Sequence, residues 1–341
     1  MTSILVATES TVFVVDANGG SMSPSTGLGD RPTCLTADSA TGRAWCGTQQ
    51  GGAYRSDDGG ASWRRVRLEG RRIMSITASP ARPDLLWVGT EPSEVWRSQN
   101  GGESWEQTDP LETLPSSPEW SFPPKPDTHH VRWIACHPRD ADRLWVAIEA
   151  GALVSTLDGG RSWHDRVERG PWDTHELAIH PNAPDSLRVS AGDGYFESDD
   201  GGATWTSPES GLDVGYLRSV AIDPGRPDVV IVSAASGPRR AYGAGVSDGR
   251  LYRREGHGRW ERVRNGWPDP PNTIAPLLTA GTSAGELWAA DERGVHRSDD
   301  GGVSWRIVAR FAAKPTYLRG VSVIGELVAN LIAVALIGWR S

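Results

Sequence analysis

The chain has 341 residues, a formal net charge of −8, 40 glycines and 16 tryptophans. The acidic balance argues against a nucleic-acid partner, because proteins that bind nucleic acids usually carry a surplus of basic residues. Residues 1–8 contain no basic segment followed by a long apolar one, so they predict no signal peptide, and three cysteines predict no disulfide framework. We therefore expect a cytoplasmic protein with a single domain.

Short runs with alternating apolar residues, rich in β-branched and aromatic side chains, predict strands in pairs. A lone strand is expected first, at 4–7. Six pairs of an inner strand and a second strand then follow in chain order, at 32–37 with 44–47, 73–78 with 86–89, 131–136 with 144–147, 174–179 with 187–190, 217–222 with 229–232, and 274–279 with 287–289. A final inner strand at 318–323 has no second strand after it.

One motif, Ser/Thr-x-Asp/Asn-x-Gly-x-x-Trp, recurs between these pairs. Its five copies are 56–63, 98–105, 156–163, 198–205 and 298–305. The side chain at the third position can accept hydrogen bonds from backbone N–H groups that follow, and the glycines supply the positive φ of a tight turn. The tryptophan buries a large apolar surface. Each copy is expected to lead into an outer strand, at 162–167 in the third copy.

These repeats predict an all-β, seven-bladed β-propeller with four-stranded antiparallel blades. The N-terminal blade lacks an inner strand, and the C-terminal inner strand lacks a blade. We therefore expect the C-terminal strand to complete the N-terminal blade, which closes the ring and removes exposed sheet edges. We expect one propeller over residues 1–324. The apolar tail, 325–341, is too short to span a bilayer, so no membrane partner is expected, and no role is assigned to it.

Two insertions, 108–128 and 236–249, are expected on the propeller face opposite the repeated motif, and insertions that gather on one face usually mark the working face. Inner strands line the channel of a propeller, so we aligned their first residues. Two columns combine basic, acidic and phenolic side chains at the expected channel mouth: Arg31, Arg72, Arg132, Arg218, Arg319, His130, His175, Asp173, Tyr216 and Tyr317.

Several arginines around one cavity suit a carboxylate, phosphate or sulfate. Predicted ligand-binding residues are Arg31, Arg72, Arg132, Arg218, Arg319, Tyr216, Tyr317, Trp120 and Glu91, and predicted catalytic residues are His130, His175, Asp173 and Glu149. Two alternatives stay open. The arginines could instead pair with the acids that end the second strands, and Trp120 could anchor the first insertion rather than contact a ligand.

The motif is the Asp-box, and the chain resembles the BNR/Asp-box family of β-propellers, which includes sialidases, xyloglucan hydrolases and photosystem II assembly factors. The resemblance implies a structural role for the motif. Arg132, Arg218 and Arg319 are similar to the arginine triad of sialidases, but the chain lacks their Arg-Ile-Pro motif and has seven predicted blades where they have six. Xyloglucan hydrolases pair two propellers, and assembly factors bind a partner's chain through an arginine patch.

The favoured function is a glycosidase-like hydrolase or a lyase that acts on a small anionic or sugar-like molecule. A non-catalytic propeller that binds a protein partner is the first alternative. The second is a metal-dependent lyase in which His130 and His175 hold a divalent metal with Asp173 or Glu149. No other cofactor is expected.

Overall fold

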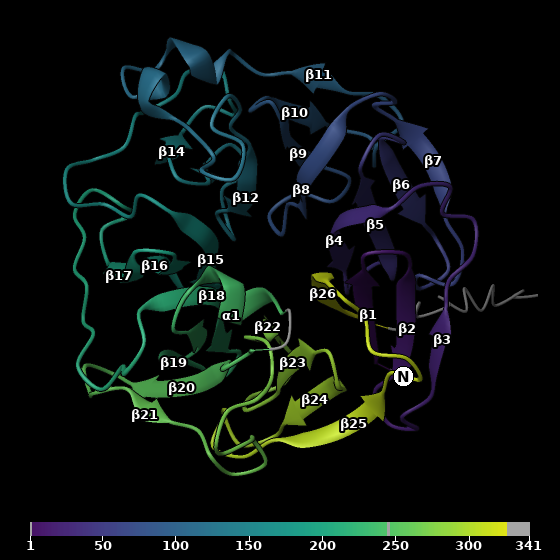
Figure 1. The fold of residues 1–341 in the computed structure, drawn as a ribbon. Helices are drawn as coiled ribbons and strands as arrows, with labels where there is room; N and C mark the ends of the chain where they lie inside the picture. The colour runs from purple at the N-terminus through teal and green to yellow at the C-terminus, as the bar shows by residue number, and fades with distance from the viewer. Residues whose placement is uncertain (1, 244–245, 326–341) are drawn as a thin grey trace, which may run out of the picture.

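The computed structural model describes residues 2–243 and 246–325, which form seven antiparallel sheets around a central axis (Figure 1). We number the blades 1 to 7 along the chain. Their strands, from the channel outwards, are β26 (Leu318–Ile324), β1 (Ser3–Thr8), β2 (Val12–Asp16) and β3 (Met22–Pro24) in blade 1; β4 (Pro32–Asp38), β5 (Arg43–Thr48), β6 (Ala53–Ser56) and β7 (Arg64–Arg67) in blade 2; β8 (Arg72–Ala78), β9 (Leu86–Glu91), β10 (Val95–Ser98) and β11 (Glu106–Gln107) in blade 3; β12 (Val131–Cys136), β13 (Leu144–Ile148) and β14 (Ala152–Thr156) in blade 4; β15 (Thr174–His180), β16 (Ala183–Ala191) and β17 (Gly194–Ser198) in blade 5; β18 (Tyr216–Asp223), β19 (Arg226–Ala235), β20 (Arg250–Glu255) and β21 (Glu261–Arg262) in blade 6; and β22 (Leu277–Ala280), β23 (Leu287–Asp291), β24 (Gly294–Ser298) and β25 (Arg306–Arg310) in blade 7.

The predicted seven-bladed propeller and its closure are confirmed. Strand β26 pairs with β1 in an antiparallel ladder that runs from Ser3 opposite Ile324 to Thr8 opposite Leu318. Figure 1 shows this as the yellow β26 lying beside the purple β1. The predicted tail lies outside the described residues except for residue 325. No helix in the described part of the chain is long and apolar enough to cross a membrane.

Two blades differ from the predicted four strands. The expected outer strand at 162–167 is reduced to a single bridge between Ser155 and His164, and blade 5 has a matching bridge between Glu197 and Thr206. Proline explains part of the difference, because Pro208 follows the second bridge closely and cannot donate to a ladder. Pro276 likewise accounts for the late start of β22, which begins three residues after the predicted 274.

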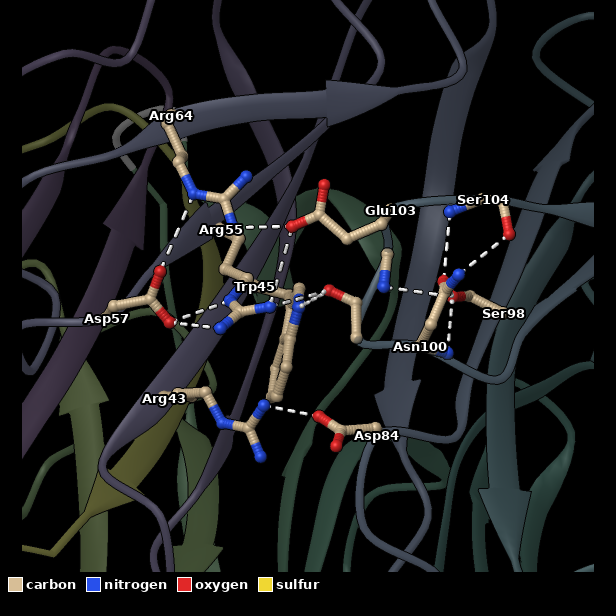
Figure 2. Close-up of polar contacts among 12 residues, drawn as sticks. Arg43, Trp45, Arg55, Asp57, Arg64, Asp84, Ser98, Asn100, Glu103 and Ser104 are labelled. Carbon is tan, nitrogen blue, oxygen red and sulfur yellow. Dashed lines mark hydrogen bonds and ion pairs between the residues drawn. The ribbon is translucent and has the colours of Figure 1, made fainter.

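The Asp-boxes join neighbouring blades. Figure 2 shows the copy at 98–105, where the Ser98 hydroxyl donates to Asn100 and accepts from the Gly102 N–H, 2.9 Å away. The turn leaves the Gly101 carbonyl free, and Trp45 of blade 2 donates its indole N–H to that oxygen over 3.0 Å. Arg55 of blade 2 reaches the same oxygen. The motif therefore links neighbouring blades through hydrogen bonds, and none of its residues lines the central cavity described below.

The blades also pack through apolar side chains. Trp87 of blade 3 is fully buried in one cluster with Val131 and Val146 of blade 4, and comparable clusters fill the other blade interfaces. Alternation along each strand produces this arrangement, since every second residue points into the space between two sheets. The large side chains between blades fix the ring and leave its centre open.

Candidate functional site at the centre of the ring

A cavity of about 1370 Å³ opens at the centre of the propeller. The inner strands form its floor, and both predicted insertions contribute to its wall. The first insertion carries the short 3₁₀ helices η1 (Leu111–Thr113) and η2 (Ser117–Glu119) and supplies Phe122 and Lys125. The second forms the helix α1 (Pro238–Tyr242) and supplies Arg239 and Tyr242. The volume exceeds the roughly 300–1,000 Å³ that is usual for small-molecule pockets.

The wall is basic although the chain is acidic. Among the described residues that line the cavity, six are basic and three are acidic: Arg72, Lys125, Arg132, Arg239, Lys314 and Arg319, against Glu91, Glu149 and Glu292. With a net charge of −8 for the whole chain, this concentration of basic groups is local. A low-dielectric wall with an excess of positive groups focuses its field on the cavity and attracts anions.

The aligned arginine column corresponds to one backbone feature. Each inner strand except β22 has a register shift near its first residues, a β-bulge in which one residue has no partner on the second strand. The bulged residues are Thr33, Met74, Arg132, His175, Arg218 and Arg319. All six line a small cavity of about 60 Å³ below the large one, so the bulges turn one side chain per blade towards the channel.

Some basic groups of the wall are paired with acids. Glu91 lies 3.5 Å from Arg72 Nε and 3.1 Å from Lys125 Nζ. Glu149 lies 3.8 Å from Arg132 Nε. These contacts match the predicted alternative, pairing between inner-strand arginines and second-strand acids, and Arg72 is the clearest case.

Other basic groups lack such a partner. Arg319, Lys314 and Arg239 have no carboxylate within 4.0 Å in the described part of the structure. The Arg319 guanidinium lies over the Tyr317 ring, 4.5 Å from its centroid, and its Nε has no hydrogen-bond partner among the described residues. Burial lowers the pKa of Arg319, which remains a cation at neutral pH. This end of the cavity can therefore receive an anion without first breaking an ion pair.

Three predicted ligand residues lie elsewhere. Arg218 is 2% exposed, and its guanidinium donates to the carbonyls of Ala275 (2.6 Å) and Leu318 (3.1 Å), because the late start of β22 leaves Ala275 outside a ladder. Arg31 is exposed and does not line the cavity. Trp120 is 5% exposed and sits in the blade-4 core, where its indole N–H donates to Ser116. We assign Arg218 and Trp120 to the fold.

A buried cluster of two histidines and two acids lies beside Arg132. His130 Nε2 is 2.6 Å from Glu149 Oε2. Burial alone would raise the pKa of Glu149, but Arg132 and the hydrogen bond from His130 outweigh it and hold the pKa at about 2. Glu149 is therefore ionised at neutral pH, which makes the imidazole the donor in this bond.

His175 faces both acids of the cluster. Its Nδ1 donates to the Leu217 carbonyl over 2.6 Å, so Nε2 carries the free lone pair of the neutral ring. This nitrogen lies 3.7 Å from Glu149 Oε1 and 3.7 Å from Asp173 Oδ2. Burial lowers the pKa of His175, and burial together with Glu149 raises the pKa of Asp173. Because the His175 imidazole is neutral, it carries no positive charge that could offset the negative charge of Glu149 and Asp173.

Three tyrosines connect this cluster to the cavity. The Tyr216 hydroxyl is 3.4 Å from His175 Nε2 and 3.4 Å from the Tyr242 hydroxyl. Tyr242 also accepts from Arg132 Nη2 at 3.5 Å, and its ring stacks on Tyr317 with centroids 5.6 Å apart. Burial raises the pKa of Tyr216, so its phenol stays protonated and can donate.

Sequence reasoning missed several of these residues. Tyr242 and Arg239 lie in the second insertion, whose face was predicted but whose individual side chains gave no signal. Lys314 lies in the connection before β26, outside both insertions. Glu292 follows β23 and lines the cavity, where burial and then Asp291 raise its pKa. Only the fold places these four side chains near the aligned columns.

No protein-family model matches the sequence, and no curated protein does either. Solved structures show similarity in the fold. The GH74 xyloglucanase from Xanthomonas campestris matches with a TM-score of 0.67 and 16% identity over 94% of this chain and 52% of its own. The chain spans 39 to 52% of the GH74 structures that it matches.

A second group of similar structures is matched over most of both chains. YCF48 from Cyanidioschyzon merolae matches with a TM-score of 0.58 and 15% identity, over 92% of this chain and 90% of its own. YCF48 bound to D1 peptide matches with a TM-score of 0.56 and 19% identity over 82% and 83%. The chain is thus a seven-bladed β-propeller that resembles GH74 xyloglucanase and YCF48, which are propellers of the BNR/Asp-box type. At these identities the likeness extends to the fold alone.

Proposed function

We propose that the central cavity binds a small anionic or sugar-like molecule and catalyses its hydrolysis or elimination. The observation that carries this proposal is the basic wall of the cavity within an acidic protein. Similarity to the GH74 xyloglucanase adds a carbohydrate as one ligand class. A uronic acid or another acidic sugar would satisfy both features.

The anion would bind between Arg132 and Arg319. These guanidinium groups occupy bulge positions on β12 and β26 and both line the large cavity. A guanidinium can donate two parallel hydrogen bonds to a carboxylate or phosphate. Lys314 adds a third cation at the exposed edge. Neutralising a carboxylate in this way also acidifies the adjacent C–H bond, as an elimination requires. The proton would pass to Nδ1 of His130, which lines the cavity and has no hydrogen-bond partner at that nitrogen among the described residues.

The tyrosine pair offers a group for proton transfer. Tyr216 and Tyr242 share a hydrogen bond and line the cavity, and the protonated Tyr216 can donate to a leaving oxygen. Glu292 is a second candidate acid, because its pKa is raised. Glu149 is ionised at neutral pH and cannot donate a proton there. The catalytic roles of His130, His175 and Asp173 stay predictions.

A thermal-shift panel tests the binding step. Uronic acids, sialic acid, sugar phosphates and dicarboxylates are compared, since a ligand that binds only the folded state raises the midpoint with its concentration. We expect one anion class to raise the midpoint by several degrees, and Arg132→Gln and Arg319→Gln to abolish the shift. The control is Arg310→Gln, which changes an exposed arginine on the outer strand of blade 7. A flat panel, or a shift that survives both cavity substitutions, contradicts the proposal.

Turnover is tested with the anion that binds. Tyr216→Phe removes the hydroxyl and keeps the ring, so we expect the binding shift to remain while product formation falls at least tenfold. Hydrolysis and elimination are separated by their products, since only elimination creates a carbon–carbon double bond that absorbs in the ultraviolet. Binding without any product from the whole panel would rule out the catalytic half of the proposal.

The second candidate function is binding of a peptide from a protein partner in the same cavity. YCF48 bound to D1 peptide resembles this chain in fold, and a cavity of about 1370 Å³ can hold several residues of an extended chain. A flat small-molecule panel, followed by capture of a partner that Arg132→Gln and Arg319→Gln both lose, would favour this candidate.

A further inference from the structure

We infer that Glu149, Asp173 and His175 form a binding site for a divalent transition-metal ion of the zinc or manganese kind at the wall of the central cavity. The inference extends the proposed function, because the ion would lie beside the proposed anion site, but it stands on separate geometry. The three ligand atoms, Glu149 Oε1, Asp173 Oδ2 and His175 Nε2, all lie within 4.8 Å of one another.

Each of the three side chains is held by its other polar atom. Glu149 Oε2 accepts from His130 Nε2, Asp173 Oδ1 accepts from the Ala150 N–H at 3.0 Å, and His175 Nδ1 donates to the Leu217 carbonyl. The atoms that remain are the three that converge, and His175 Nε2 has the Tyr216 hydroxyl as a further neighbour at 3.4 Å. A metal-binding histidine usually donates its second N–H to a carbonyl or carboxylate, which fixes the tautomer and aims the free nitrogen at the ion.

The distances fit an ion better than direct hydrogen bonds. His175 Nε2 lies 3.7 Å from each carboxylate oxygen, which is too long for a good hydrogen bond. Two ligands that bind zinc at about 2.1 Å in a tetrahedral arrangement lie about 3.4 Å apart, so each contact from His175 to a carboxylate would shorten by roughly 0.3 Å around an ion. The two carboxylate oxygens lie within 4.8 Å of each other. The His175 side chain is fully buried, and its Nε2 faces both carboxylates while its Nδ1 is held by the Leu217 carbonyl.

The backbone also makes room for this arrangement. A Cβ atom on Gly192 would lie 2.0 Å from Asp173 Oδ2 and 3.3 Å from His175 Cε1. Any side chain there would therefore displace the carboxylate from its place opposite His175. Glycine at this position keeps Asp173 within reach of the other two ligands.

One imidazole nitrogen and two carboxylate oxygens suit zinc or manganese, whereas magnesium and calcium prefer oxygen alone. Glu149 and Tyr216 both line the large cavity, so an ion at this place would have one side directed towards a bound molecule. It could polarise an oxygen of the anion held by Arg132. His175 would then act as a ligand, and proton transfer would rest with the tyrosines.

The test measures metal binding directly. Protein freed of metal with a chelator is titrated calorimetrically with Zn²⁺, Mn²⁺, Mg²⁺ and Ca²⁺, and metal content is measured after gel filtration. We expect one equivalent of Zn²⁺ or Mn²⁺ to bind, and Asp173→Asn and His175→Gln to weaken that binding at least tenfold. The matched control, Glu91→Gln, removes an acid of the same cavity that lies outside the cluster. Three results would overturn the inference: no metal binding, binding by both variants that is as tight as in the wild-type protein, or a preference for Ca²⁺.

Two further measurements keep the result interpretable. Co²⁺ absorption bands of the wild-type protein report coordination without any substitution, and Gly192→Ala tests the site through the backbone if a ligand variant fails to fold. If the absorption bands of Co²⁺ with the protein are neither shifted nor more intense than those of Co²⁺ in buffer, the site is not supported. The anion panel is repeated on metal-free protein. A shift that depends on Arg132 but not on metal supports the proposed function, and the metal site is then judged by the calorimetric titration alone. Metal binding with a flat panel supports the metal site and contradicts the proposed function.

Discussion

Arg218 is predicted from the sequence to bind a ligand, and its contacts in the structure suit a structural role, so one substitution can separate the two. It starts from β18 in blade 6, and its guanidinium donates to Ala275 next to blade 7 and to Leu318 in blade 1. One side chain thus bridges three blades at the centre of the ring. No acid lies within ion-pair distance of it in the described residues, and its charge rests on carbonyl dipoles and on the Tyr242 ring, 4.6 Å away.

Replacement of Arg218 by methionine keeps the apolar stem and removes the donors. Hydrogen bonds from a charged donor contribute about 1.5–3 kcal/mol each, so the loss of the two shorter ones, to Ala275 and Leu318, gives about 3–6 kcal/mol. The third bond, to the Ala241 carbonyl, is 3.4 Å long and adds little. Removal of a buried charge without an acidic partner offsets part of this loss. We expect a net destabilisation of about 2–4 kcal/mol, with Arg218→Lys in between because an ammonium group can still reach one carbonyl.

Thermal and urea unfolding measure the effect. At roughly 2–4 °C per kcal/mol for domains of somewhat smaller size, the expected decrease in the midpoint is about 4–16 °C. Arg310→Met is the control, because this exposed arginine makes no ion pair among the described residues, and its midpoint should change by less than about 1 °C. If Arg218→Met leaves the midpoint unchanged and abolishes anion binding, the structural assignment is wrong and Arg218 is a ligand residue.

Three other predictions follow from single contacts. Burial raises the pKa of Glu176 from its usual 4.5 to about 8, so its contribution to stability is complete below pH 4.5 and is lost as the pH rises from there to about 8. Glu176→Gln should flatten the decline in unfolding midpoint between about pH 5 and 8, and an unchanged profile contradicts this. Gly60→Ala should lower the free energy of urea unfolding by at least 1 kcal/mol more than Gly59→Ala. Both glycines have positive φ, but only a Cβ on Gly60 would meet a side chain of blade 1, at 2.4 Å from Leu5. Equal losses would refute the packing explanation. Trp145→Phe should lower the free energy of unfolding by at least 1 kcal/mol, because it removes the 3.1 Å hydrogen bond to the Asp-box of blade 5. The control, Trp172→Phe at an exposed site, should change it by less than about 0.5 kcal/mol. Similar values for the two would argue against a stabilising link between blades.

The sequence predicted the ring and its closure because both depend on counting. Seven second strands and one spare inner strand allow one economical solution, and the ladder between β1 and β26 has that register. Composition, in contrast, gave no warning of the β-bulges. Alternation with period two fails at each bulge, so the residues on either side of it do not share a face: Ile73 packs against blade 2, whereas Ser75 bonds to Val131 of blade 4.

Equivalent positions acquired different roles through their neighbours. Arg132 and Arg218 occupy the same bulge in blades 4 and 6. Arg132 meets Glu149 and the cavity, whereas Arg218 meets the carbonyl of Ala275, which is free only because Pro276 delays the next strand. This contact joins residues 57 positions apart and depends on how one blade begins, so the aligned column alone could not separate the two arginines.

The ladder between β1 and β26 also sets an order in time. Its partners Ser3 and Ile324 are among the first and the last residues that the structure describes, so a ribosome must finish almost the whole propeller before either finds the other. The entropic cost of joining such distant segments grows only logarithmically with their separation, but the search is slow. Blades 2 to 7 can form as local antiparallel units while blade 1 keeps an unpaired edge on β1. The first blade of the sequence is therefore the last to be completed, and the nascent chain must keep that edge from other strands until residue 324 has emerged.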